Sequence, residues 1–129
     1  MKLETPSITI QKNTAEVFEF LTDLKNFKQL MPNDIEKFEA NGESFLFALS
    51  GMPEIKLVLK EKTLNHQIVL GAASSKLDFN LTLKLNEVSE NSTSGQLYFD
   101  GNFNPMMAMM VKKPLTNLIN TISNNLKNI

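Results

Sequence analysis

The most constraining feature of the sequence is the strict alternation of apolar and polar side chains over residues 77–85, which read LDFNLTLKL. Successive side chains of a β-strand point to opposite faces of the sheet, so this segment predicts a strand with one wholly apolar face. The apolar members of the segment are Leu77, Phe79, Leu81, Leu83 and Leu85. A sheet built from such strands must bury that face against a second layer.

The same two-residue period recurs through most of residues 35–103. It predicts strands at residues 35–40, 44–50, 54–62, 66–73, 77–85 and 96–103, after an opening strand at 6–11. Asn41-Gly42 is a strong hairpin signal, and turns are expected at residues 50–53, at Asn65 and through the polar segment 87–95. The prediction is an antiparallel sheet of about six to seven strands.

Two short helices are expected after the first strand. Asn13 is a favourable N-cap, and Glu16 stands three residues later, as in a capping box. The first helix places Val17, Phe18, Leu21 and Leu24 on one stripe. A second short helix carries Leu24, Phe27 and Leu30 and ends before Pro32.

A long helix is expected from Asn104-Pro105 to the end of the chain, with asparagine as the cap and proline at the first helical position. Its aliphatic stripe consists of Val111, Leu115, Leu118, Ile119, Ile122 and Leu126. Among the expected elements, only this helix is long enough to cover the sheet. The prediction is an α+β fold in one domain spanning residues 1–129, with a curved sheet wrapped on the C-terminal helix.

Four methionines occur within residues 106–110 of this helix. At about 100° per residue, Met106, Met109 and Met110 centre roughly 145–170° away from the aliphatic stripe. Pro114 lies between the two sets and is expected to kink the helix. The hypothesis is that this bend turns the pliable methionines towards the sheet as a cavity wall. The alternatives are a plug in the core or a surface for a partner.

Composition excludes several classes of site. The chain has no cysteine, which removes disulfides, thiolate catalysis and cysteine metal ligands. All thirteen basic residues are lysine and the net charge is −1, so nucleic-acid binding is not expected. No apolar run is long enough to span a bilayer and no signal peptide is present, which makes a cytoplasmic location the default expectation. We expect no metal and no cofactor.

Catalytic candidates are few. His66 is the only histidine, and its place beside Asn65 indicates an exposed turn residue rather than a general base. Tyr98 and Asp100 alternate with Phe99, which places them on the outer face of the sheet. Ser74-Ser75 lies in an expected loop, and neither a nucleophile elbow nor a glycine-rich phosphate loop is present.

The order of elements and two segments resemble the START-like superfamily, also called SRPBCC or the polyketide cyclase and birch-allergen-like fold. The segments are ITIQKNTAEVFEFLTDLKNFKQLMP, residues 8–32, and NPMMAMMVKKPLTNLINTI, residues 104–122. SGM at residues 50–52, followed by alternating leucines, is similar to the carbon-monoxide-dehydrogenase branch of that superfamily. The resemblance implies a helix-grip fold with an apolar cavity between sheet and helix. The superfamily includes lipid-binding domains, aromatase/cyclases and chaperone activators, so the resemblance implies no single reaction.

The functional hypothesis is binding of a hydrophobic or amphipathic small molecule, lipid-like or polyketide-like, without chemical change. An enzyme of the cyclase or dehydratase type and an interaction or assembly module with a filled core are the alternatives, and the oligomeric state is left open. The residues expected to face the cavity are Met31, Phe45, Phe47, Leu57, Leu59, Leu81, Leu83, Phe99, Phe103, Met106, Met107 and Met110.

Overall fold

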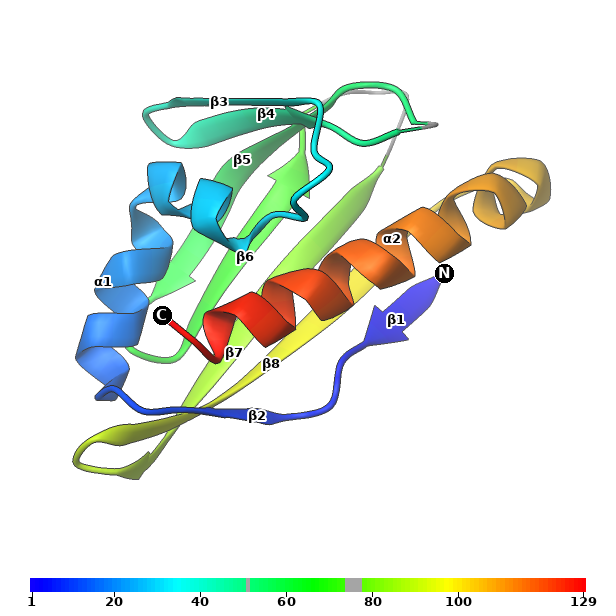
Figure 1. Cartoon of the computed structure of the whole chain (residues 1–129). Helices are drawn as coiled ribbons and strands as arrows, with labels where there is room; N and C mark the ends of the chain where they lie inside the picture. The colour runs from blue at the N-terminus through cyan, green and yellow to red at the C-terminus, as the bar shows by residue number, and fades with distance from the viewer. Residues whose placement is uncertain (51, 74–77) are drawn as a thin grey trace.

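The computed structural model describes residues 1–50, 52–73 and 78–129. These residues form a curved antiparallel sheet crossed on its inner face by a long C-terminal helix, with two short helical segments at one end (Figure 1). The elements, in chain order, are β1 (Lys2–Glu4), β2 (Ile8–Ile10), α1 (Thr14–Thr22), the 3₁₀ helix η1 (Leu24–Leu30), β3 (Lys37–Asn41), β4 (Ser44–Ala48), β5 (Ile55–Thr63), β6 (Gln67–Ala72), β7 (Phe79–Ser89), β8 (Ser92–Gly101) and α2 (Pro105–Leu126).

The described strands follow the order β1-β8-β7-β6-β5-β4-β3, and β2 also pairs with β8. The expected opening strand at residues 6–11 is thus replaced by two short strands on either side of Pro6. Proline cannot donate to a strand ladder. Thr5 bridges the break, because its backbone N–H donates to the carbonyl of Leu97 at 3.0 Å and its Oγ1 accepts from the Leu97 N–H at 3.1 Å.

The hairpin turns fall largely where the sequence places them. Gly42 and Asn65 both adopt positive φ angles, of 63° and 59°, as glycine and asparagine do most readily in turns. The expected turn over residues 87–95 is wrong, because β7 continues to Ser89 and β8 starts at Ser92. Tertiary contacts explain this difference. Thr93 is completely buried and donates a hydrogen bond from Oγ1 to the Lys12 carbonyl at 2.8 Å, so this polar segment is held as strand.

The inner face of the sheet carries the predicted apolar alternation. Leu81, Leu83 and Phe99 are buried, and Phe103 is half-buried just beyond the end of β8. Leu77, which belongs to the same pattern, lies outside the described residues. The expected register of β7 and β8 is therefore confirmed, with Leu81 directly opposite Phe99.

The helical segment after β2 divides as expected, although its second part is a 3₁₀ helix. Asn13 Oδ1 accepts from the Glu16 backbone N–H at 2.8 Å, which confirms the N-cap of α1. Leu24, Phe27 and Leu30 are all buried. Their three-residue spacing suits the three residues per turn of a 3₁₀ helix, which places them on one face.

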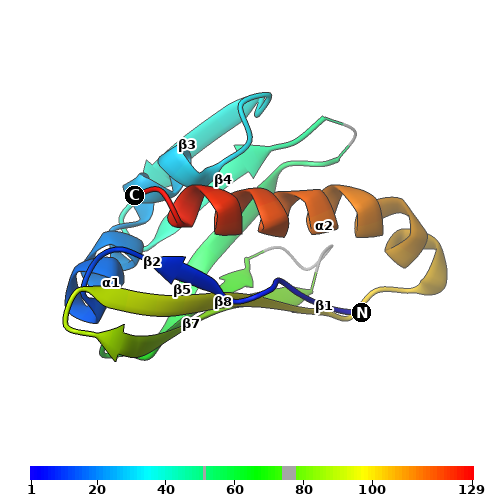
Figure 2. The same cartoon turned by 60° about the horizontal axis from the view of Figure 1, so that its bottom comes forward.

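Helix α2 begins at its predicted cap, where Asn104 Oδ1 accepts from the Met107 backbone N–H at 2.8 Å. All six residues of the predicted aliphatic stripe are buried against the sheet. Pro114 lies inside the helix without ending it, and the first turns extend past the sheet (Figure 2). Among the helices of the described ranges, none combines the length and hydropathy of a bilayer span.

The hypothesis that Pro114 turns the methionines inward is wrong. The exposed fractions are 74% for Met106, 83% for Met109 and 64% for Met110. Because residues 105–126 form a single helix, the methionines keep the angular position that the wheel gives them, away from the buried stripe. Only Met107 is half-buried and packs against the core.

Candidate ligand site between the sheet and the C-terminal helix

The structure brings most of the predicted cavity residues together on the inner side of the sheet. Met106 and Met110 are the exceptions, since their exposed side chains do not face the interior. Leu59, Phe103 and Met107 are half-buried at its edge, and Leu59 adjoins a register shift in β5. The buried members are Met31, Phe45, Phe47, Leu57, Leu81, Leu83 and Phe99.

Phenylalanine rings occupy much of the space beneath β3 and β4. The ring centre of Phe45 lies 5.0 Å from that of Phe27, 5.4 Å from Phe38 and 5.9 Å from Phe47. These separations are within the range of favourable aromatic pairs. Phe27 and Phe38 are absent from the predicted cavity set, although their apolar positions in η1 and β3 were the available signal. This end of the interior is filled by the protein's own side chains.

A second aromatic group lies where β7 and β8 end. Phe79 and Phe99 have ring centres 4.9 Å apart, and Phe103 lies 6.2 Å from Phe99. Gly101 makes this packing possible, because a Cβ at that position would approach the Phe103 ring to 2.6 Å and the Phe99 ring to 2.9 Å. Phe79 is a further inward residue that the predicted set omitted, despite its place in the alternating segment.

The buried polar groups of the described residues are hydroxyls: Thr5, Thr14, Thr93 and Ser123. Thr14 and Thr93 form a hydrogen bond of 3.1 Å between their side-chain oxygens, which ties α1 to β8. No histidine or acidic side chain is buried in this part of the chain. A cyclase or dehydratase would require a general acid or base converging on the interior, and the described interior offers no such group.

An opening into the interior lies beside Pro114. It is a crevice of about 250 Å³ between α2, the end of β4 and the segment after η1. Leu49 and Leu118 are buried at its base, whereas Asp34, Ser50 and Asn117 are exposed at its rim. Pro114 has no N–H to donate to the Met110 carbonyl, so the helical ladder is weakened beside this crevice.

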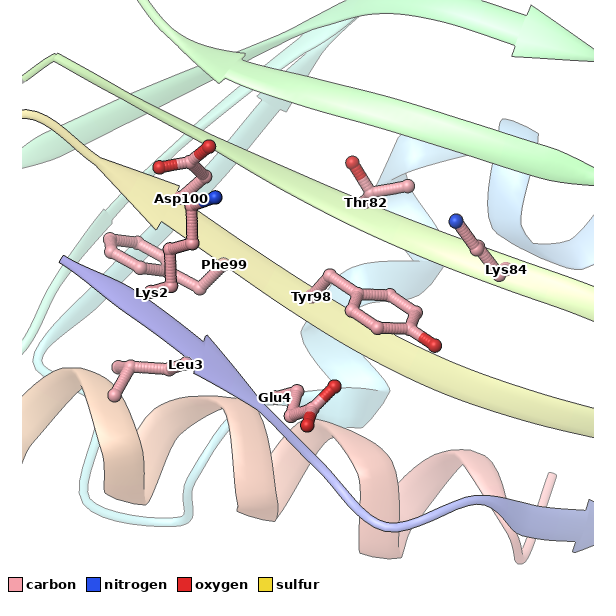
Figure 3. A pocket seen from close by; sticks show the side chains of 8 residues that line it. All are labelled: Lys2, Leu3, Glu4, Thr82, Lys84, Tyr98, Phe99 and Asp100. Atoms are coloured by element: carbon pink, nitrogen blue, oxygen red, sulfur yellow. The ribbon is translucent and has the colours of Figure 1, made fainter.

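A second hollow, of about 460 Å³, lies on the outer face of the sheet along β1, β7 and β8 (Figure 3). The Nζ atom of Lys84 lies 4.9 Å from the centre of the Tyr98 ring, and the Tyr98 hydroxyl donates to Gln96 Oε1 at 2.8 Å. Asp100 is exposed in this hollow. The prediction that Tyr98 and Asp100 belong to the outer face is confirmed.

His66 is exposed in the turn between β5 and β6, as predicted, and its backbone N–H donates to the Thr63 carbonyl at 2.9 Å. It borders a hollow of about 490 Å³ together with Glu87. Across residues 1–50, 52–73 and 78–129, no three His, Asp or Glu side chains are grouped as a metal site would require. Ser74-Ser75 lies outside the described residues.

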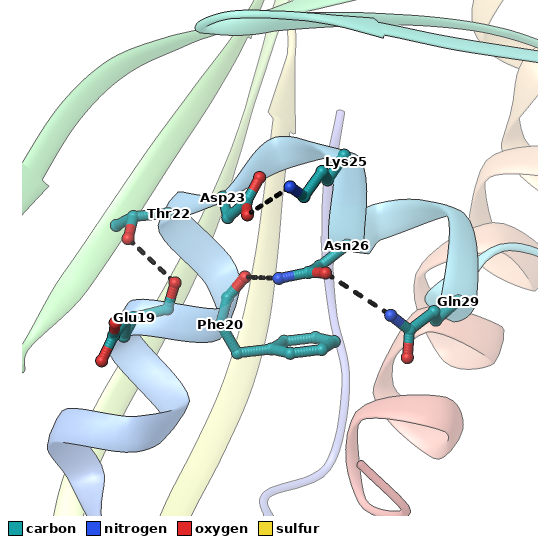
Figure 4. Close-up of polar contacts among 7 residues, drawn as sticks. All are labelled: Glu19, Phe20, Thr22, Asp23, Lys25, Asn26 and Gln29. Atoms are coloured by element: carbon teal, nitrogen blue, oxygen red, sulfur yellow. Dashed lines mark hydrogen bonds and ion pairs between the residues drawn. The ribbon is translucent and has the colours of Figure 1, made fainter.

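The surface between α1 and η1 is acidic. Glu16, Glu19 and Asp23 border a shallow hollow there, and Lys25 pairs with Asp23 at 3.5 Å (Figure 4). Asn26 Nδ2 donates to the Phe20 carbonyl at 3.0 Å, which joins η1 to α1. These contacts stabilise the connection between the two helical segments.

On β3, the Lys37 Nζ donates to Glu54 Oε2 at 3.1 Å. This hydrogen bond, with the nearby charge of Glu39, raises the pKa of Lys37 above its ordinary value. Both partners are exposed at the edge of the sheet, so the pair lies outside the interior site.

No protein-family model matches the chain, and no curated protein matches its sequence. Solved structures match over nearly its whole length. XoxI from Bacillus cereus has a TM-score of 0.76 at 10% identity, covering 98% of this chain and 93% of that one. A START superfamily protein from Mycobacterium smegmatis has a TM-score of 0.69 at 11% identity, covering 98% and 97%.

Norcoclaurine synthase from Thalictrum flavum, in complex with dopamine and hydroxybenzaldehyde, has a TM-score of 0.74 at 12% identity, covering 99% of this chain and 86% of that one. Identities this low concern the fold alone, and one of these neighbours is an enzyme. Together with the curved sheet and the long helix α2 on its inner face, they show that the chain has the START-like helix-grip fold.

Proposed function

We propose that the protein binds a hydrophobic or amphipathic small molecule between the sheet and α2 without changing it chemically. The observation that carries the proposal is the crevice beside Pro114, whose base is formed by apolar side chains that continue into the core. Apolar walls supply the driving force for such a ligand. The exposed polar groups of Asp34, Ser50 and Asn117 at the rim are suited to its polar end.

The size of the crevice limits how the ligand enters. Its volume of about 250 Å³ is slightly below the roughly 300–1,000 Å³ of ordinary small-molecule sites. A ligand would therefore displace side chains at its base, and Leu49 and Leu118 are the first in its path. Met31, next to the crevice residue Pro32, has the unbranched side chain that adapts most easily to such a change.

The two halves of α2 differ in how they would respond. Asn125 Nδ2 donates to the Leu30 carbonyl at 3.0 Å, which fastens the C-terminal half to η1. Pro114 lies three turns earlier, where the helical ladder lacks one hydrogen bond. We expect the N-terminal half of α2 to move away from β4 when the ligand enters.

A matched pair of variants tests this entry route. Asn117→Trp places a bulky ring at the rim of the crevice, whereas Asn124→Trp places the same ring on the same helical face two turns later. Native mass spectrometry of the protein purified from its own host would first show whether a small molecule co-purifies. Titration with a fluorescent fatty acid then measures affinity, and Asn117→Trp should weaken binding by about tenfold or more while Asn124→Trp leaves it unchanged.

Two results would overturn the proposal. The first is that the wild-type protein carries no small molecule and binds none of a panel of fatty acids, sterols and aromatic polyketides. The second is that both tryptophan variants weaken binding equally, which would place the ligand elsewhere. Urea melts of the two variants control for damage to the fold.

One observation favours a second candidate, an interaction or assembly module with a filled core. The stacked rings of Phe27, Phe38 and Phe45 already occupy the interior beneath β3 and β4. In such a module the core only supports the outer surface. Failure of every small-molecule probe, with an unaltered fold, would favour this candidate.

A further inference from the structure

The first turns of α2 expose a concentrated group of apolar side chains. Of the five large hydrophobic residues most exposed in the described chain, three are Met106, Met109 and Met110. The other two are Leu64 and Val88, in the β5–β6 turn and near the end of β7. The methionines share one helical face, because positions three and four apart are neighbours on a helix. We call Met106, Met109 and Met110 the methionine face.

Positive charge accompanies the methionine face. Lys112 and Lys113 are exposed in the next turn, and Lys113 lies on the same helical side. Residues 101–129 contain three lysines and no acidic residue, whereas residues 1–100 contain ten lysines and fourteen acidic residues. The chain as a whole has a net charge of −1, so the basic character is local to the C-terminal helix.

The shape of this region restricts its partner. The first turns of α2 project beyond the sheet as a narrow convex tip (Figures 1 and 2). A stable protein interface buries about 800 Å² on each partner, which is more than three methionine side chains on one helical turn supply. A lipid interface requires no complementary groove, and it rewards apolar side chains flanked by lysine.

We propose that the methionine face and the adjacent Lys112 and Lys113 dock the protein on an anionic lipid surface. The methionines enter the boundary between headgroups and acyl chains, and the two ammonium groups lie at the level of the lipid phosphates. Two weak signals of this kind give reversible association rather than permanent anchoring. The proposal does not depend on a ligand between the sheet and α2, because none of these five side chains lines the crevice.

Sedimentation with vesicles tests the proposal on the full chain. The wild-type protein should bind phosphatidylcholine vesicles that contain phosphatidylglycerol, bind pure phosphatidylcholine vesicles much more weakly, and dissociate as salt is raised. The triple variant Met106→Gln/Met109→Gln/Met110→Gln should lose about tenfold or more in affinity. The matched control is Leu64→Gln/Val88→Gln, which removes the other two exposed apolar side chains and should bind as the wild type does.

The contribution of charge is tested separately. Lys112→Gln/Lys113→Gln should weaken binding to the anionic vesicles by about fivefold per lysine. Lys60→Gln/Lys62→Gln makes the same change in net charge on exposed residues of β5 and should have little effect. Fluorescent fatty-acid titration of all variants provides the readout for the internal site, which should not change.

Three outcomes would overturn the proposal. The wild type fails to bind anionic vesicles, or the control variants lose as much binding as the methionine and lysine variants. In the third outcome, light scattering shows a dimer that the methionine substitutions abolish while vesicle binding is absent, which would assign the methionine face to a second copy of the chain.

Discussion

The two halves of α2 are parts of one continuous helix, yet their apolar residues have opposite environments. In the C-terminal half, Leu118 and Ile122 are buried beneath the sheet, whereas Met109 and Met110 in the N-terminal half are exposed. Both sets are apolar and both have helical spacing. The difference lies in angle and position, because the methionines are on the opposite face of the helix and near the end that projects past the sheet (Figure 2). An apolar helical turn is therefore not by itself part of a core.

The largest expected effect is in the buried half. Ile122→Ala should lower the free energy of unfolding by about 2–5 kcal/mol, because it removes buried methyl groups and leaves a cavity. Urea melts measure this change, and Leu83→Ala on the facing sheet should give a loss of similar size. A loss under about 0.5 kcal/mol at either site, as is typical of exposed positions, would contradict the assignment of these residues to the core.

Pro114 separates the two halves and provides the next effect. Pro114→Ala restores an N–H for the Met110 carbonyl and should raise the free energy of unfolding by up to about 3 kcal/mol. The same substitution should reduce fatty-acid binding, since a stiffer helix opens less readily. Thermal melts and ligand titration on one preparation measure both. Increased stability with unchanged binding would show that Pro114 has no part in ligand entry.

The helix caps compare a packed helix with a projecting one. Asn13→Ala removes the cap of α1, whose first turn is tied to β8 through Thr14, and should cost about 1 kcal/mol. Asn104→Ala removes an equivalent cap at the projecting end of α2 and should cost less than about 0.5 kcal/mol. Hydrogen exchange should show faster opening of residues 105–110 alone. Equal losses of global stability would mean that the tip of α2 is coupled to the core.

The smallest effect is expected at the methionine face itself. Replacement of Met106, Met109 or Met110 singly by Gln should change the free energy of unfolding by less than about 0.5 kcal/mol, because these side chains are already exposed. Met107→Gln is the internal comparison, since Met107 is half-buried and should cost more. Urea melts that rank Met109 with Ile122 would remove the distinction between the two halves.

Much of the fold was predictable because local patterns determine which face of an element is apolar. The alternation around Leu81 and Leu83 specified the inner face of β7, and the stripe from Val111 to Leu126 specified the buried side of α2. The asparagine caps were also predictable, because capping depends on a side chain and the first few N–H groups of its own helix. The division at Pro6 and the extended strands around residues 87–95 were not, because they depend on pairing with distant segments.

The candidate site shows the same limit. The sequence by itself determined the sheet, the capped helices and which side chains of β4, β5, β7 and β8 point inward, since these follow from backbone periods of two and 3.6 residues. Only the tertiary structure decided that Phe27 and Phe38 stack on Phe45, that a crevice opens beside Pro114, and that Met106 and Met110 face away from the core. Periodicity fixes the direction of a side chain relative to its own element, whereas burial depends on where the neighbouring layer ends.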